Sequence, residues 1–217
     1  MTPAAYQQFL TELLGEESIV YFTPPVVQHS ADRSTIIAWP DQRSLAARKQ
    51  VSEYSVQEYL ADLQENNYTC LLPNAALLQI EYKWKHGAVQ YHRYCYIPAP
   101  FDLGGESVRP EEMENLVDFA SNLTVDDIRL KTKLRFEFDE AQTAQNHPKS
   151  HLHIHYPECR IPVKSSIGIH SFFRFIYRYF CADQYSVSRV LSRRRSDGGL
   201  DSLSNEERRD AHVFWHT

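Results

Sequence analysis

Alternating histidines form the segment of this chain that is best suited to chemistry. The segment HLHIHY occupies residues 151–156. Successive side chains of an extended strand point to opposite faces, so the sequence predicts that His151, His153 and His155 share one face. An unperturbed imidazole has a pKa of about 6.5 and can take up or release a proton near neutral pH. The spacing therefore suits general acid–base catalysis, and it also suits metal ligation.

A second alternating segment, LKTKLRFEFDE at 130–140, supplies charged groups nearby. Arg135, Glu137 and Asp139 fall on one face, and apolar side chains fall on the other. If the two segments pair as an antiparallel hairpin, three imidazoles lie beside one arginine and two carboxylates. The connecting loop, 140–150, is longer than a hairpin requires, and long loops on a rigid sheet often carry functional residues.

The favoured interpretation is metal-independent cleavage of RNA or another phosphodiester, without a cofactor. His151 and His147 would transfer the protons, because an imidazole can act as both base and acid. Arg135 and Arg160 would bind the phosphate and stabilise its developing charge. Asp139 would orient one of the histidines. These five residues are the predicted catalytic group, and no metal ligand is assigned.

Two alternatives use the same strand face. Imidazoles at positions i and i+2 can share a metal ion, with Asp139 or Glu137 across the hairpin as a third ligand, and this would make a metal-dependent hydrolase. The other alternative is a non-catalytic partner module of a larger toxin or defence complex. An enzyme should gather its histidines and arginines in a concave pocket, whereas a partner module should present a flat or apolar surface.

Positive charge is concentrated in the part of the chain that contains these segments. The net charge is −5 at pH 7, yet Lys and Arg outnumber Asp and Glu in residues 128–182, whereas acidic residues dominate 101–127. This distribution is compatible with a phosphate-bearing partner such as RNA, and the negative total argues against indiscriminate nucleic-acid binding. The predicted nucleic-acid contacts are Lys131, Lys133, Arg193, Arg194 and Arg195.

Length and composition indicate an ordinary globular protein. A chain of 217 residues can bury one good core and is short for two full domains. The four cysteines are too far apart for a Cys-x-x-Cys metal site. We find neither a signal-peptide pattern nor an apolar run of the roughly 18 residues that a membrane span requires. The sequence therefore predicts a cytoplasmic protein with reduced thiols and no membrane contact.

The expected elements describe an α+β fold. A second hairpin is predicted at 76–98, with its turn at His86 and Gly87. Helices are predicted at 2–14, from Ser55, from Pro110, at 167–180 and at 204–215. We predict a single domain over residues 1–217, in which a twisted, mainly antiparallel sheet has helices packed on one face and at its ends. Residues 183–217 are expected to form a helical extension.

Several blocks of the sequence resemble one known family. They are IIAWP at 36–40, NAALLQIEYKW at 74–84, YHRYCYIPAP at 91–100, RFEFDE at 135–140, HPKSHL at 147–152 and ECRIPV at 158–163. Together they resemble the family catalogued as domain of unknown function 2290, with the last two blocks as the most specific part. The resemblance implies a bacterial cytosolic protein without an established activity. The residues that match the family pattern are Arg135, Asp139, His147, Ser150, His151 and Arg160.

Two histidines depart from that pattern, and a second resemblance is more local. His153 and His155 do not match, which argues against a metal site made of three histidines. A strand, a His-Pro loop, a histidine-bearing strand and a closing helix are also similar to the TumE-type toxins. That similarity implies a toxin or anti-phage defence effector acting on RNA, with an antitoxin or another protein as its partner.

Overall fold

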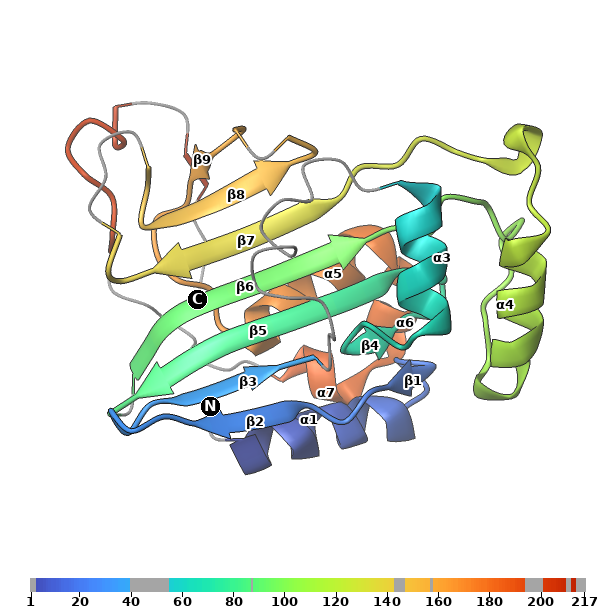
Figure 1. Cartoon of the computed structure of the whole chain (residues 1–217), viewed down its shortest axis with the longest axis horizontal. Helices are drawn as coiled ribbons and strands as arrows, with labels where there is room; N and C mark the ends of the chain where they lie inside the picture. The colour runs from blue at the N-terminus through green and yellow to red at the C-terminus, as the bar shows by residue number, and fades with distance from the viewer. Residues whose placement is uncertain are drawn as a thin grey trace.

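An antiparallel sheet of nine strands forms the body of the protein in its computed structural model (Figure 1). The structure describes residues 3–39, 55–86, 88–142, 147–156, 158–193, 201–209 and 212–213. Along the main path of the sheet lie β1 (Tyr21–Phe22), β4 (Cys70–Leu71), β5 (Leu77–Lys85), β6 (Ala88–Ile97), β7 (Leu134–Asp139), β8 (Ser150–Ile154) and β9 (Ile161–Pro162). Beside this path, β3 (Thr35–Ala38) pairs with β5 and with β2 (Val26–His29).

Both predicted hairpins are confirmed. Strands β5 and β6 form the longer one, and His86 in its turn has a left-handed backbone with a φ of 51°. Strands β7 and β8 form the second, in which Glu137 lies opposite His151 and Arg135 lies opposite His153. Strand β6 also pairs with β7, so the two hairpins join into one continuous four-stranded layer.

Helices pack against one face of this layer. They are α1 (Pro3–Gly15), α5 (Ile169–Phe180), α6 (Ala182–Val187) and α7 (Arg189–Ser192). The apolar side chains of the strands meet them in the larger core, where Phe136 packs edge to face against Phe172 of α5 at a ring distance of 6.0 Å. Each fully buried side chain of this size contributes roughly 1.5–3 kcal/mol to folding. The core therefore explains why one face of every central strand is apolar.

Two further helices cover only one end of the opposite face (Figure 1). They are α3 (Val56–Gln64) and α4 (Met113–Ser121), and their apolar side chains form a second core with residues of β5 and β6. The helix predicted from Ser55 is confirmed as α3, and a capping box starts it: Ser55 Oγ accepts from the Glu58 amide, and the Glu58 carboxylate accepts from the Ser55 amide. The chain leaves α4 through the short 3-10 turn η2 (Val125–Asp127), and 128–133 then leads into β7. This arrangement places α3 beside the polar face.

The α+β fold class is confirmed, and two local predictions are wrong. The described residues 205–209 form turns instead of the predicted helix, although Ser204 and Glu207 make the reciprocal capping bonds. His155 does not continue β8, because the strand ends at Ile154 and the His155 backbone turns to a φ of 64°. The division into one domain with an extension from residue 183 stays a prediction. No helix in the described ranges is long and apolar enough to cross a membrane.

Candidate functional site

A row of charged side chains crosses four neighbouring strands on the polar face. Glu81, Arg93, Glu137 and His151 lie directly opposite one another on β5, β6, β7 and β8. Directly opposed residues of antiparallel strands project from the same side of the sheet. The sequence predicted this polar face, but it did not predict its burial: His151 is only 2% exposed, and Glu81 and Arg93 are 8% exposed.

Glu137 is the centre of the row. Its Oε1 lies 2.8 Å from Arg93 Nε, which donates a hydrogen bond, and 3.2 Å from Arg135 Nε, which is aligned for an ion pair only. Its Oε2 lies 3.3 Å from His151 Nε2 and 3.2 Å from His153 Nε2. Burial by itself would raise the pKa of Glu137, but the two histidines and the two guanidinium charges outweigh it and hold that pKa well below its usual range. Glu137 is therefore a carboxylate at neutral pH.

The ring of His151 has a fixed orientation. Its Nδ1 lies 2.8 Å from the carbonyl oxygen of Pro148, and a carbonyl oxygen can only accept, so Nδ1 carries the hydrogen. In the neutral ring the lone pair is then on Nε2, which faces Glu137. The end of the long loop thus sets which nitrogen of His151 meets the carboxylate.

His153 completes the group and connects it with a cavity. The residue is 4% exposed, and its Nδ1 is buried without a hydrogen-bond partner in the described part of the chain. Burial lowers the pKa of His153, and the hydrogen bond to Glu137 opposes this effect without cancelling it. We call Glu137, His151 and His153 the His–Glu cluster.

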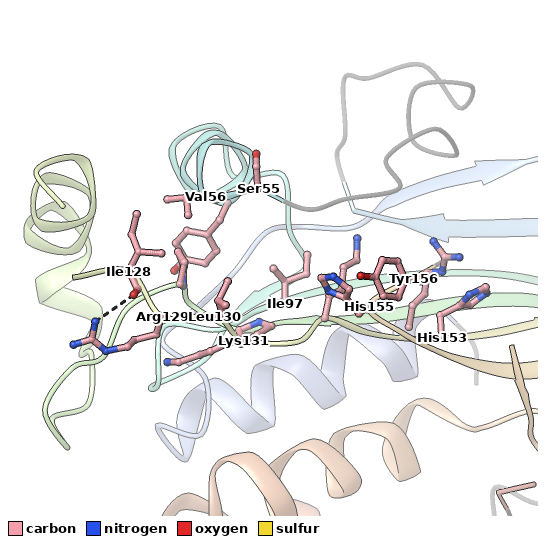
Figure 2. Close-up of a pocket in the computed structure, with 15 residues that line it drawn as sticks. Ser55, Val56, Ile97, Ile128, Arg129, Leu130, Lys131, His153, His155 and Tyr156 are labelled. Carbon is pink, nitrogen blue, oxygen red and sulfur yellow. Dashed lines mark hydrogen bonds between the residues drawn. The ribbon is translucent and has the colours of Figure 1, made fainter. Parts of the chain in front are cut away.

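His153 also lines a cavity of about 140 Å³, which therefore adjoins the His–Glu cluster. Figure 2 shows this pocket and the residues that line it. Its walls come from the start of α3, from 128–133 and from the ends of β7 and β8, including His155 and Tyr156. None of the described residues that line it is Asp or Glu. The positively charged or titratable lining residues are Arg129, Lys131, Lys133, Arg135, His153 and His155. The charge of this pocket suits an anion.

Two of the predicted catalytic residues, His147 and Arg160, are not part of the pocket. The ring of His147 contacts the ring of His151 at a centroid distance of 4.8 Å. Burial lowers the pKa of His147, and the charges of His151 and Arg160 add to this effect. Arg160 itself is exposed.

Asp139 does not contact a histidine in the described residues. Its Oδ1 accepts a hydrogen bond from the Ala141 amide at 2.9 Å, so its side chain caps the turn after β7. The carboxylate that contacts the histidines is Glu137, which lies two residues earlier on the same face. Of the two candidates for a third metal ligand, Glu137 is the one that the register brings to His151 and His153.

The predicted nucleic-acid contacts separate into two groups. Lys131 and Lys133 line the pocket, and Lys131 Nζ also donates to the Phe101 carbonyl at 2.6 Å. Arg193 instead pairs with Glu12 of α1 at 3.1 Å, among the helices that cover the apolar face. Arg194 and Arg195 lie outside the described residues.

Sequence reasoning missed Arg93 and Glu81. The alternation of residues 77–97 places both on one face of the first hairpin, so a signal was present. The missing information was the pairing of β6 with β7, which brings Arg93 opposite Glu137 from 44 positions away in the sequence.

Comparisons with known proteins identify a family. The comparison with curated proteins gave no match, and neither did the comparison with solved structures. The similarity to TumE-type toxins is therefore not shown. A family model described as "Uncharacterized conserved protein (DUF2290)" matches residues 19–215, which include the whole His–Glu cluster and every residue that lines the pocket. The chain belongs to the DUF2290 family.

Proposed function

We propose that this protein binds RNA through its phosphates in the pocket and cleaves a phosphodiester at the end bounded by Arg135 and His153. One observation carries the proposal: the described lining contains four Lys or Arg side chains and two histidines, and no carboxylate. Cationic side chains that gather around a phosphate provide most of the affinity of nucleic-acid-binding proteins.

The positions of Arg135 and Lys133 support a phosphate at the end of the pocket that adjoins the His–Glu cluster. Arg135 lies beside the His–Glu cluster and also lines the pocket. Burial lowers the pKa of the neighbouring Lys133, so a bound anion would favour its charged form. A phosphate held between Arg135 and Lys133 would reach His153, the histidine that belongs to both the cluster and the pocket.

Aromatic side chains make RNA a suitable ligand. Tyr59 and Tyr156 both line the pocket. The hydroxyl of Tyr59 donates to the Ala75 carbonyl at 2.6 Å, which fixes its ring at the pocket wall. Tyr156 is 58% exposed and offers an open ring face at the rim. Tyr59 is only 1% exposed and forms part of the wall, so the ring available for stacking is that of Tyr156. Bases of single-stranded RNA stack on such an exposed ring, whereas bases within a duplex are already stacked.

The residue roles differ from those first inferred from the sequence. Both ring nitrogens of His151 are within hydrogen-bonding distance of Pro148 or Glu137, and His147 and Arg160 do not line the pocket. We therefore assign substrate contact to His153 and Arg135. The concave, cationic pocket favours an enzyme over a partner module, which should present a flat or apolar surface.

The biological role that we propose is that of a bacterial toxin or anti-phage defence effector, acting on RNA in the cytoplasm. A toxin of this kind would have an antitoxin or another protein as its partner.

RNA binding is tested with a matched pair of lysine variants. Lys131 lines the pocket, whereas Lys164 is an exposed lysine that does not. With a fluorescent single-stranded RNA, K131E should weaken binding about tenfold or more and reduce the salt dependence, and K164E should stay within about twofold of the wild type. Equal losses in both variants would mean that binding is diffuse, and the proposal would fail.

A further inference from the structure

We infer that Glu137, His151 and His153 bind a divalent metal ion of the zinc class at the inner end of the pocket. The role of this ion in cleavage rests on the proposed function, but the site itself rests on geometry alone. Histidine nitrogens and a carboxylate oxygen are ligands that Zn²⁺ takes.

The separations of the ligand atoms fit a tetrahedral ion. The three potential ligand atoms lie within 4.8 Å of one another. Glu137 Oε2 is 3.3 Å from His151 Nε2 and 3.2 Å from His153 Nε2. Zinc bonds of about 2.0–2.2 Å at tetrahedral angles place neighbouring ligand atoms roughly 3.3–3.6 Å apart. The two distances from Glu137 Oε2 to the histidine nitrogens are therefore already close to those around a bound zinc ion. Small side-chain rotations would adjust the distance between the two histidine nitrogens.

The tautomer of His151 is the one that ligation needs. Metal-bound histidines usually donate their other ring N–H to a carbonyl or a carboxylate, which orients the ring. The Pro148 carbonyl is that acceptor here, at 2.8 Å from Nδ1. A metal ion bound here would take the lone pair of Nε2 in place of a proton, between this nitrogen and the Glu137 carboxylate.

Three protein ligands leave a fourth position, which is the pattern of catalytic rather than structural zinc sites. Because His153 and Arg135 also line the pocket, this position would adjoin the proposed phosphate. Bound water there would lose a proton more readily. Its oxygen would bond to phosphorus as a P–O ester bond breaks, and the leaving oxygen would take up a proton. One water molecule is consumed, and the products are a phosphate monoester and a free hydroxyl.

The charges around the site predict that metal and anion bind cooperatively. Arg93 and Arg135 face Glu137, and Glu81 lies opposite Arg93, so these four charges cancel. A divalent ion would leave the site with an excess of positive charge, which an anion in the pocket would offset. Since coupling between two ligands is reciprocal, inorganic phosphate should raise the affinity for the metal, and the metal should raise the affinity for phosphate.

The test measures metal binding on the full chain, independently of RNA. Titration with Co²⁺ should give the visible absorption of a tetrahedral complex, and elemental analysis after Zn²⁺ loading should find about one ion per chain. H153Q should weaken binding at least tenfold. H155Q is the matched control, because His155 lines the same pocket outside the cluster, and it should bind like the wild type.

A measurement on the wild type alone covers the case in which H153Q does not fold. Zn²⁺ should raise the unfolding temperature, and should raise it further when inorganic phosphate is present. A wild type that binds no ion in either assay, or an H155Q loss equal to that of H153Q, would overturn the inference. RNA cleavage that persists in EDTA would overturn the role of the ion in cleavage while leaving the proposed function intact. Metal binding without RNA binding would contradict only the proposed function.

Discussion

Arg93 and Glu137 lie directly opposite each other on β6 and β7, and Arg93 Nε donates to Glu137 Oε1 across 2.8 Å. The pair is largely shielded from solvent, with side-chain exposures of 10% and 15%. Because Arg93 holds one carboxylate oxygen, the other is directed toward the histidines of β8. An ion pair that joins the two hairpins thus orients the centre of the candidate site.

Removing the charge of Glu137 should destabilise the protein strongly. E137Q leaves the buried Arg93 and the partly buried Arg135 without their shared carboxylate, and breaking a shielded ion pair in this way costs about 3 kcal/mol or more. Urea unfolding of the metal-free protein gives the free energy directly. The control is E140Q, in an exposed pair with Lys149 at 3.5 Å, which should change stability by less than about 1 kcal/mol. Similar losses in the two variants would contradict the anchoring role of Glu137.

Acid should destabilise the fold through His92. This residue is fully buried on the apolar face, where its Nε2 accepts a hydrogen bond from the Ile167 amide at 3.1 Å. Burial lowers the pKa of His92 from 6.5 to about 3. Below about pH 6.5, His92 is therefore protonated in the unfolded chain but stays neutral in the folded protein. The free energy of unfolding falls by up to about 1.4 kcal/mol per pH unit from there toward pH 3.

Urea titrations at pH 7.5, 6.0 and 5.0 measure this loss. H92Q should flatten the dependence on pH, whereas H29Q, which changes an exposed histidine of β2, should leave it as it is. A wild type whose stability does not change between pH 7.5 and 5.0 would show that His92 titrates normally.

Tyr156 should contribute to RNA affinity by stacking. Loss of one base–aromatic stack costs about 1–3 kcal/mol, so Y156A should weaken binding of single-stranded RNA roughly 5- to 150-fold, and Y156F should retain it. Tyr179 of α5 is similarly exposed, at 62%, but does not line the pocket. Y179A is therefore the control in a fluorescence-anisotropy titration, and an equal effect of Y156A and Y179A would argue against a base at the pocket rim.

Expression in bacterial cells should reveal the activity on RNA. The wild type should slow growth and fragment total RNA. H153A and K131E should do neither, because H153A removes the histidine at the proposed cleavage position and K131E replaces a positive charge of the pocket with a negative one. H29A serves as the histidine control and should behave like the wild type. Intact RNA in cells that express the soluble wild type would count against the toxin role.

The sequence by itself determined which residues share a face and where several elements begin. Alternation placed Arg135 and Glu137 with His151 and His153, and the helix predicted from Ser55 begins there as α3. These features are local, since strand periodicity and capping depend on residues a few positions apart. Local signals also have limits: the capping box at Ser204 did not produce a helix, because a cap contributes only about 1 kcal/mol and most helical stability comes from packing an apolar face.

Only the tertiary structure decided that Arg93 meets Glu137, that α3 and 128–133 enclose the end of the polar face, and that His155 leaves the strand. Each of these depends on contacts between segments far apart in the chain. Where a long connection joins two paired strands, as between β6 and β7, no tight turn sets their register. The register is fixed when the whole sheet assembles around its core, because a shift of one residue would exchange the buried and exposed faces. The sequence therefore determines which residue types the candidate site contains. The assembled fold determines how deeply they are buried, how their charges balance and where the pocket lies.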